Sequence, residues 1–96
     1  MSDVPEVEGV FTVRSPMGLH ARPAGRFASL AGRFESEISL GRGDEWVSGS
    51  SVLSILCLAA TQGTALCIRA VGADAEEAVA QLGALIEAHG EEPPDP

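Results

Sequence analysis

Apolar residues occupy every second position in three stretches of the chain, which is the spacing of a strand with one buried face. Strands are therefore predicted over residues 10–14, 35–40 and 65–71. Their inward positions are Phe11, Val13, Ile38, Leu40, Leu66, Ile68 and Ala70. Residues 41–44 have the composition of a turn, so residues 45–49 are expected to return as a short strand and complete a hairpin.

Three further stretches place apolar residues three and four positions apart, which is typical of a helix with one buried face. Helices are predicted over residues 21–33, 52–58 and 75–89. Ser50 or Ser51 is a suitable N-cap for the second helix. Asp74 and Glu77 form a capping-box pattern at the start of the third. One face of the third helix carries Ala78, Val79, Leu82, Leu85, Ile86 and His89, and Gly90 ends it.

The predicted order of elements is β-α-β-β-α-β-α, which indicates an α+β fold with one antiparallel sheet and three helices. Trp46, the only tryptophan, lies in the hairpin. Its ring belongs either to the core or to a sheet face that no helix covers. His89 falls in the last turn of the third helix, where nothing in the sequence suggests phosphate binding, and we assign it a structural or solvent role.

The length of 96 residues predicts a single domain over residues 1–90. Residues 1–7 are expected to be a loose leader, and residues 91–96 an acidic, proline-rich tail without order. No run approaches the ~20 apolar residues of a membrane span, and the N-terminus lacks the features of a signal peptide. We therefore expect a cytoplasmic protein with no membrane partner.

The cysteines and the charges narrow the possible chemistry. Cys57 and Cys67 have no CxxC or zinc-like spacing, so we interpret them as buried small hydrophobes and expect no metal or organic cofactor. The net charge of −8 argues against nucleic acid as a partner. Residues 14–34 nevertheless hold four arginines and no acid. This segment forms an anion site or a docking face for an acidic partner, unless the charge asymmetry serves solubility alone.

Residues 17–25 read as the end of a strand, a turn and the first turn of a helix. Gly18 allows a sharp bend, and Pro23 suits the first helical turn because its missing N–H has no intrahelical partner there. His20 then lies at or next to the N-cap, where unpaired N–H groups and the helix dipole favour anions. With Arg22 two residues later, this site has the groups needed to accept a phosphoryl group.

The heptapeptide GLHARPA, residues 18–24, resembles the active-site signature of HPr, the histidine-containing phosphocarrier of the bacterial phosphoenolpyruvate-dependent phosphotransferase system. Residues 51–56 are similar to the regulatory-serine segment of that family, and residues 61–64 to the turn that follows it. The resemblance spans residues 7–88 and implies a four-stranded antiparallel sheet with all three helices on one face. Several members of the family carry a small polar residue before the glycine, whereas this chain has Met17 there.

The resemblance implies that His20 takes a phosphoryl group on Nδ1 from phosphorylated Enzyme I and hands it to sugar-specific IIA proteins. Arg22 would contact the phosphoryl group, while Gly18, Ala21 and Pro23 would shape the site. The protein would be a carrier and not an enzyme, and we expect a monomer. Two alternatives stay open: a carrier for a regulatory, nitrogen-related branch, and a regulatory domain that binds a free anion at His20 and Arg22 without covalent chemistry.

The second block of residues suggests regulation and docking. The resemblance aligns Ser51 with the serine that HPr kinase/phosphorylase modifies in some bacteria, although a helix N-cap is by itself a sufficient reason for a serine. Ser50 is a neighbouring rival. Val52, Leu53 and Leu56 form either a partner-docking patch beside His20 or part of the core.

Overall fold

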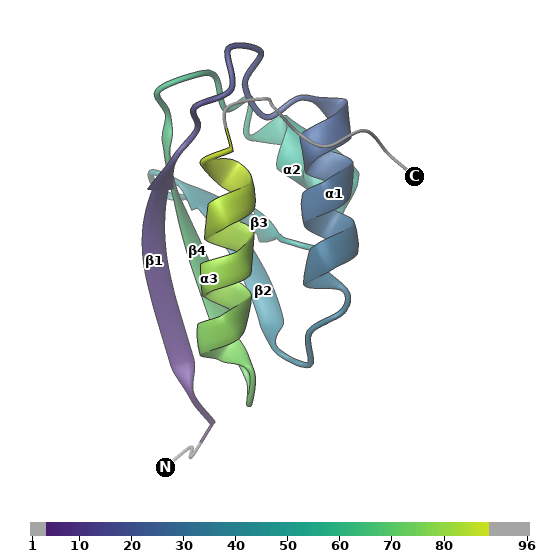
Figure 1. Ribbon diagram of the computed structural model, residues 1–96, viewed down its shortest axis with the longest axis vertical. Coiled ribbons are helices and arrows are strands. Elements are labelled where there is room, and N and C mark those ends of the chain that lie inside the picture. Colours follow the sequence, from purple (N-terminus) through teal and green to yellow (C-terminus); the bar gives the residue numbers. More distant parts are fainter. Residues whose placement is uncertain (1–3, 89–96) are drawn as a thin grey trace.

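The computed structural model describes residues 4–88 and shows the predicted order of elements. The elements are β1 (Glu6–Thr12), α1 (Ala21–Ala31), β2 (Glu37–Arg42), β3 (Glu45–Ser48), α2 (Val52–Cys57), β4 (Ala65–Val71) and α3 (Ala75–Ile86). The three helices lie on the same side of the sheet (Figure 1). The expectations for His89, for a helix end at Gly90 and for the tail at 91–96 lie outside the described residues.

The sheet is antiparallel throughout, with the strand order β1-β4-β2-β3. β4 lies between β1 and β2, so that Arg69 is paired with Glu8 on one side and with Ser39 on the other. β1 and β3 form the two edges of the sheet. Because β1 and β4 are neighbours, the loops that leave their adjoining ends meet, and one of these loops carries His20.

The core lies between the helices and one face of the sheet. The inward residues of β4 are Leu66, Ile68 and Ala70, and all three are fully buried. They meet Phe27 of α1 and Leu82 of α3, which are also fully buried. Period-two and helical spacing therefore identified the buried faces correctly. Since burying a large apolar side chain contributes ~1.5–3 kcal/mol, these contacts supply much of the free energy that holds the helices on the sheet.

The expectation that residues 1–7 form a loose leader is wrong at Glu6 and Val7, because β1 begins at Glu6 and all seven of its residues pair with β4. Glu6 and Glu8 point to the open face of the sheet while Val7 and Gly9 face the helices, and this alternation was obscured by its weak apolar positions. α1 ends two residues earlier than predicted, at Ala31 before Gly32. β2 starts two residues later, at Glu37.

The predicted capping box at Asp74 and Glu77 is also wrong. Asp74 makes no side-chain cap to α3. Its carboxylate instead accepts hydrogen bonds from the N–H of Glu35 at 2.8 Å, the N–H of Ser36 at 2.9 Å and the hydroxyl of Ser36 at 2.6 Å. The hydrogen bond from the Ser36 hydroxyl, followed by those from the two N–H groups, lowers the pKa of Asp74. Asp74 therefore fastens the start of β2 to the start of α3.

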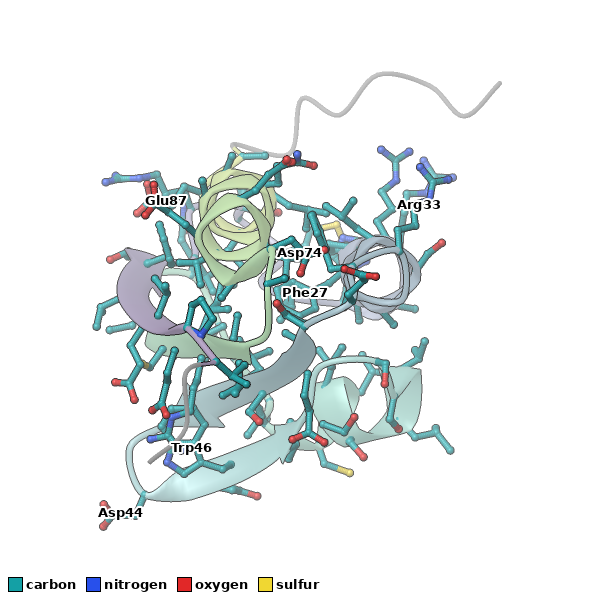
Figure 2. All side chains as sticks on the ribbon, turned by 90° about the horizontal axis from the view of Figure 1, so that it is seen from below. Phe27, Arg33, Asp44, Trp46, Asp74 and Glu87 are labelled. Atoms are coloured by element: carbon teal, nitrogen blue, oxygen red, sulfur yellow. The ribbon has the colours of Figure 1, made fainter. Side chains whose placement is uncertain are left out.

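Trp46 lies on the uncovered face of the sheet, which decides between its two possible placements (Figure 2). The ring covers Gly41 on β2, where an added Cβ would come within 2.7 Å of it. The guanidinium of Arg69 stacks over the ring, 4.3 Å from its centroid.

The two cysteines are free thiols, and the expectation that both are buried is wrong. Cys57 is exposed and Cys67 is half-buried.

Neither a membrane span nor a cluster of metal ligands is present in residues 4–88. No helix in this part of the chain is long and apolar enough to cross a bilayer. Nor do three or more histidine, cysteine or acidic side chains come together there as metal ligands.

Candidate functional site

His20 is the N-cap residue of α1. Its backbone is extended, with φ −82° and ψ −169°, and its carbonyl accepts the Ala24 N–H at 2.9 Å to close the first helical turn. Its half-buried imidazole makes no cap hydrogen bond, and the N–H groups of Ala21 and Arg22 find no acceptor among residues 4–88. A helix start with unpaired donors is an anion-binding site.

The loop before His20 is held against the segment that follows α2. The Leu19 N–H donates to the carbonyl of Ala60 at 2.9 Å, and the Gly18 N–H donates to the carbonyl of Ser15 at 2.9 Å. Gly18 has a φ of +71°, and a Cβ there would lie 2.6 Å from the Ala60 oxygen. Only glycine combines this left-handed backbone with such a close approach, which explains its place two residues before His20.

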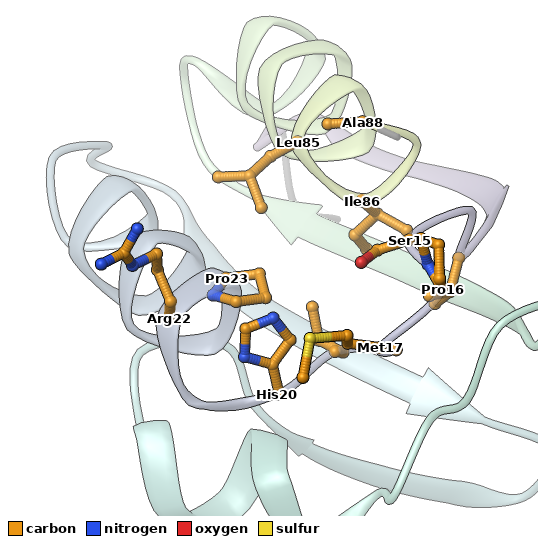
Figure 3. A pocket seen from close by; sticks show the side chains of 12 residues that line it. Ser15, Pro16, Met17, His20, Arg22, Pro23, Leu85, Ile86 and Ala88 are labelled. Carbon is orange, nitrogen blue, oxygen red and sulfur yellow. The ribbon is translucent and has the colours of Figure 1, made fainter. Parts of the chain in front are cut away.

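A cleft of about 440 Å³ opens beside the imidazole. Its walls come from the β1–α1 loop, the first turn of α1 and the C-terminal end of α3, which contributes Leu85, Ile86 and Ala88 (Figure 3). The helical spacing of Leu85 and Ile86 predicts a buried helix face, but nothing in the sequence indicates that they approach His20. The cleft exists because α3 ends next to the loop that carries the histidine.

Met17 lies beside His20 and is 75% exposed (Figure 3). A thioether is at most a weak hydrogen-bond acceptor. It therefore cannot supply the donor that a small polar side chain would place at this position. Hydrogen bonds to a bound anion have to come from the backbone N–H groups of the helix start and from nearby arginines.

Arg22 is exposed and extends away from the imidazole in Figure 3. Its guanidinium has no hydrogen bond or ion pair with any residue that the structure describes. Arg26 of α1 and Arg33, two residues beyond the end of that helix, line a shallow hollow of about 260 Å³. Residues 14–34 contain no acid, so the charged side chains that this segment contributes are all basic.

Ser51, and not Ser50, is the N-cap of α2. The Ser51 hydroxyl accepts the Ser54 N–H at 3.3 Å. The hydroxyl of Ser50 instead lies 3.1 Å from that of Ser48 and takes no part in the cap. Ser51 remains half-exposed, so its hydroxyl is accessible at the surface.

α2 divides its apolar residues between the core and the surface, as its short length requires. Ile55 is buried, whereas Leu53 is 77% and Val52 is 38% exposed. Leu56 is half-buried against the core. α2 packs against α1, so the exposed pair lies on a helix that neighbours the one with Arg22 and Arg26.

Comparison with known proteins bears on this arrangement. Residues 7–88 match the family model described as PTS HPr component phosphorylation site. The phosphocarrier protein HPr of Haemophilus influenzae is 46% identical over 69 residues, 72% of this chain and 81% of that protein. The phosphocarrier protein NPr of Shewanella violacea is 34% identical over 87 residues, 91% of this chain and 96% of that protein.

The multiphosphoryl transfer protein of Haemophilus influenzae is 41% identical over 83 residues, which are 83% of this chain but only 17% of that much longer protein. Among solved structures, the phosphocarrier protein HPr of Bacillus anthracis superposes with a TM-score of 0.82 at 34% identity. The match covers 85% of this chain and 98% of that one.

The sequence match and the shared fold thus agree over nearly the whole chain. The relatives are phosphocarriers, which pass a phosphoryl group on and are not catalysts. The chain belongs to the HPr family of phosphocarrier proteins.

Proposed function

We propose that His20 is the residue of this phosphocarrier that holds the phosphoryl group. It accepts the group from phosphorylated Enzyme I and passes it to a histidine of a IIA protein. The observation that carries this proposal is the half-buried imidazole at the start of α1, at the edge of a cleft. It has no cap hydrogen bond, and the two backbone N–H groups that follow it have no acceptor among residues 4–88.

The transfer needs few chemical steps. A neutral imidazole is nucleophilic near neutral pH. The lone pair of His20 Nδ1 attacks phosphorus in line, the N–P bond of the donor phosphohistidine breaks, and its electron pair returns to the donor ring. Such transfer depends mainly on alignment and on stabilising the oxygens. The N–H groups of Ala21 and Arg22 supply donors. The Arg22 guanidinium, which has no partner among residues 4–88, turns toward the oxygens when the group arrives.

The neighbours of His20 shape the site. Gly18 brings the loop against Ala60 without steric conflict. Ala21 adds no bulk beside the imidazole. Pro23 is buried in the first helical turn, where its missing N–H breaks no intrahelical hydrogen bond.

We also propose that both partners dock on the helical face. Leu53 and Val52 of α2 and Met17 of the loop before His20 have exposed apolar side chains, and Arg22 of α1 is a cation with no partner among residues 4–88. A partner with an apolar centre and an acidic rim fits this combination. The half-buried Leu56 contributes less than the other two residues of the predicted patch.

Phosphorylation of Ser51 by an HPr kinase/phosphorylase is part of the proposal as a regulatory step. The half-exposed hydroxyl lies at a helix start, where a phosphate is compatible with the dipole. It would add negative charge next to Val52 and Leu53. Such a charge opposes docking of an acidic partner without altering His20.

A role in a regulatory, nitrogen-related branch is the second candidate. The NPr of Shewanella violacea favours it, because that match covers 91% of this chain. The two branches differ in the IIA protein that takes the phosphoryl group. Transfer rates from the phosphorylated protein to a sugar-type and a nitrogen-type IIA protein of the same host distinguish them. In either branch we propose a monomeric, cytoplasmic carrier.

Labelling with phosphoenolpyruvate and Enzyme I of the same host tests the assignment of His20. Intact mass should show one added phosphoryl group, acid-labile and base-stable, which His20→Ala abolishes. His89→Ala removes the only other histidine and is the matched control, which should label normally. No label on the wild type, or a label that survives in His20→Ala, would contradict the proposal.

A further inference from the structure

Arg42 joins the hairpin to the end of α2. Its Nη1 donates to the carbonyl of Leu58 at 2.8 Å and to the carbonyl of Ala59 at 3.0 Å. Carbonyls at a helix end have no intrahelical N–H partner, and a cation there also complements the helix dipole. The sequence placed Arg42 in a turn and gave no sign of this contact, because the partners are backbone atoms 16 and 17 positions away.

The turn that Arg42 holds is strained. Ala59 has a φ of +50° and is the only residue other than glycine with a positive φ in the part of the chain that the structure describes. A side chain is disfavoured in this left-handed region. The turn therefore adopts this conformation only where its surroundings hold it, and the bond from Arg42 to the Ala59 carbonyl is one such restraint.

The same turn supports the loop of His20. The residue after Ala59 is Ala60, whose carbonyl accepts the Leu19 N–H at 2.9 Å and lies against Gly18. Leu19 is buried and directly precedes His20. A continuous path of hydrogen bonds and peptide units thus runs from the guanidinium through Ala59 and Ala60 to the imidazole-bearing loop.

We propose that Arg42 is a positioning residue for His20. By fixing the carbonyls of Leu58 and Ala59, it keeps the Ala60 oxygen where it binds the Leu19 N–H. This contact holds the loop, and with it the imidazole, beside the cleft. Arg42 itself does not line the cleft. The expected effect on phosphoryl transfer rests on the proposed function of His20, whereas the effect on the loop does not.

Two measurements on Arg42→Gln test this inference: hydrogen exchange of the Leu19 amide, and single-turnover transfer from phosphorylated Enzyme I. We expect faster exchange at Leu19 and transfer slowed by about threefold to thirtyfold, since small misplacements of a reacting group reduce rates strongly. KM for the carrier should change little, because the docking face is intact. Arg69→Gln, which removes an arginine bonded on the open sheet face, is the control and should change neither quantity.

Two rescue variants separate positioning from general stability. Arg42→Lys keeps a donor at the helix end and should retain most of the transfer rate. Ala59→Gly relieves the left-handed strain, so in the Arg42→Gln background it should restore slow Leu19 exchange and fast transfer. If Arg42→Gln alone fails to fold, Arg42→Lys and the Arg42→Gln/Ala59→Gly double variant serve as the test.

The outcomes separate the two proposals. If the wild type is labelled, and Arg42→Gln matches it in both Leu19 exchange and transfer, the role of Arg42 is overturned while the carrier function stands. If the wild type is not labelled by Enzyme I, the proposed function fails. Leu19 exchange in Arg42→Gln and in the Ala59→Gly double variant then still decides whether Arg42 holds the loop.

Discussion

Arg22 and Arg69 lie on opposite sides of the molecule and are used in different ways. On the open sheet face, Arg69 donates to Glu8 at 2.7 Å, lies 3.8 Å from Glu6 and stacks on Trp46. The charged hydrogen bond to Glu8 is the main cause that raises the pKa of the Arg69 guanidinium. Arg22, at the start of α1, has no partner among residues 4–88 and stands near an imidazole that is equally free.

This difference shows which charged groups are paired within the fold and which are available to a ligand. The groups around Arg69 satisfy one another, so they contribute to the stability of the sheet and leave little charge to attract a ligand. The donors around His20 have no acceptor among residues 4–88 and stay available to an anion or a partner. A cation without a partner in this part of the chain, beside free helix N–H groups, is therefore the better indicator of function.

Among the variants that test this comparison, Gly18→Ala should have the largest effect on phosphoryl transfer. The added Cβ meets the Ala60 oxygen, and the residue must also keep a φ of +71°. We expect transfer to fall about a hundredfold as the loop moves away from α2, and the free energy of unfolding to fall by more than about 1 kcal/mol. Urea unfolding and Enzyme I transfer measure the two effects.

Gly43→Ala is the matched control, since Gly43 also has a positive φ of +61° but open space around it. It should show the loss of stability without the loss of transfer. Equal transfer rates for the two variants would mean that the contact with Ala60 does not position His20.

Exchanging the two arginines for alanine should separate function from stability. Arg22→Ala removes a donor to the phosphoryl oxygens, and we expect transfer to slow about tenfold or more with unchanged thermal stability. Arg69→Ala should lower the thermal midpoint slightly and leave transfer unchanged. If Arg22→Ala and Arg69→Ala transfer the phosphoryl group at the same rate, Arg22 does not contribute to transfer.

Ser51→Asp should have a smaller effect, of about a few-fold on transfer from Enzyme I, because a charge on the docking face acts mainly on association. The effect should weaken as salt is added. Ser50→Asp places the same charge one residue away, outside the cap of α2, and should have less effect. Identical rates for wild type and Ser51→Asp at low salt would remove Ser51 from the regulatory proposal.

Asp74→Asn should affect stability alone. The pKa of Asp74 is lowered in the folded state, so its contribution is fully present above the unfolded value of about 3.9. This contribution is lost as the pH falls through the lowered folded pKa. We therefore expect wild type to be more stable than Asp74→Asn near pH 7, with the difference closing at acid pH. A difference that does not change with pH would contradict this assignment.

Local patterns in the sequence were sufficient to place His20. A bend at Gly18, a proline at the third helical position and regular apolar spacing after it all act within a few residues. The same holds for the inward face of β4. Predictions from the sequence succeeded where residues close together in the chain determine the conformation.

Contact between distant segments accounts for some of the errors, and the short length of α2 accounts for the one at Cys57. Asp74 has the local pattern of a cap, but it binds Glu35 and Ser36, which lie 39 and 38 positions away. The hydrogen bond from the Leu19 N–H to the Ala60 carbonyl could not be predicted either, because backbone atoms carry no residue-specific signal in the sequence. Cys57 is exposed because a six-residue helix buries little beyond Ile55.

The most direct test of the central claim is the discharge of the phosphorylated protein. The protein is loaded by Enzyme I, separated from it, and mixed with a IIA protein of the same host, while the phosphohistidine is followed by ³¹P NMR. We predict an Nδ1-phosphohistidine signal at His20 that disappears as a new signal rises on the IIA protein. A signal that persists with every IIA protein of the host, or that resides on another residue, would contradict the account.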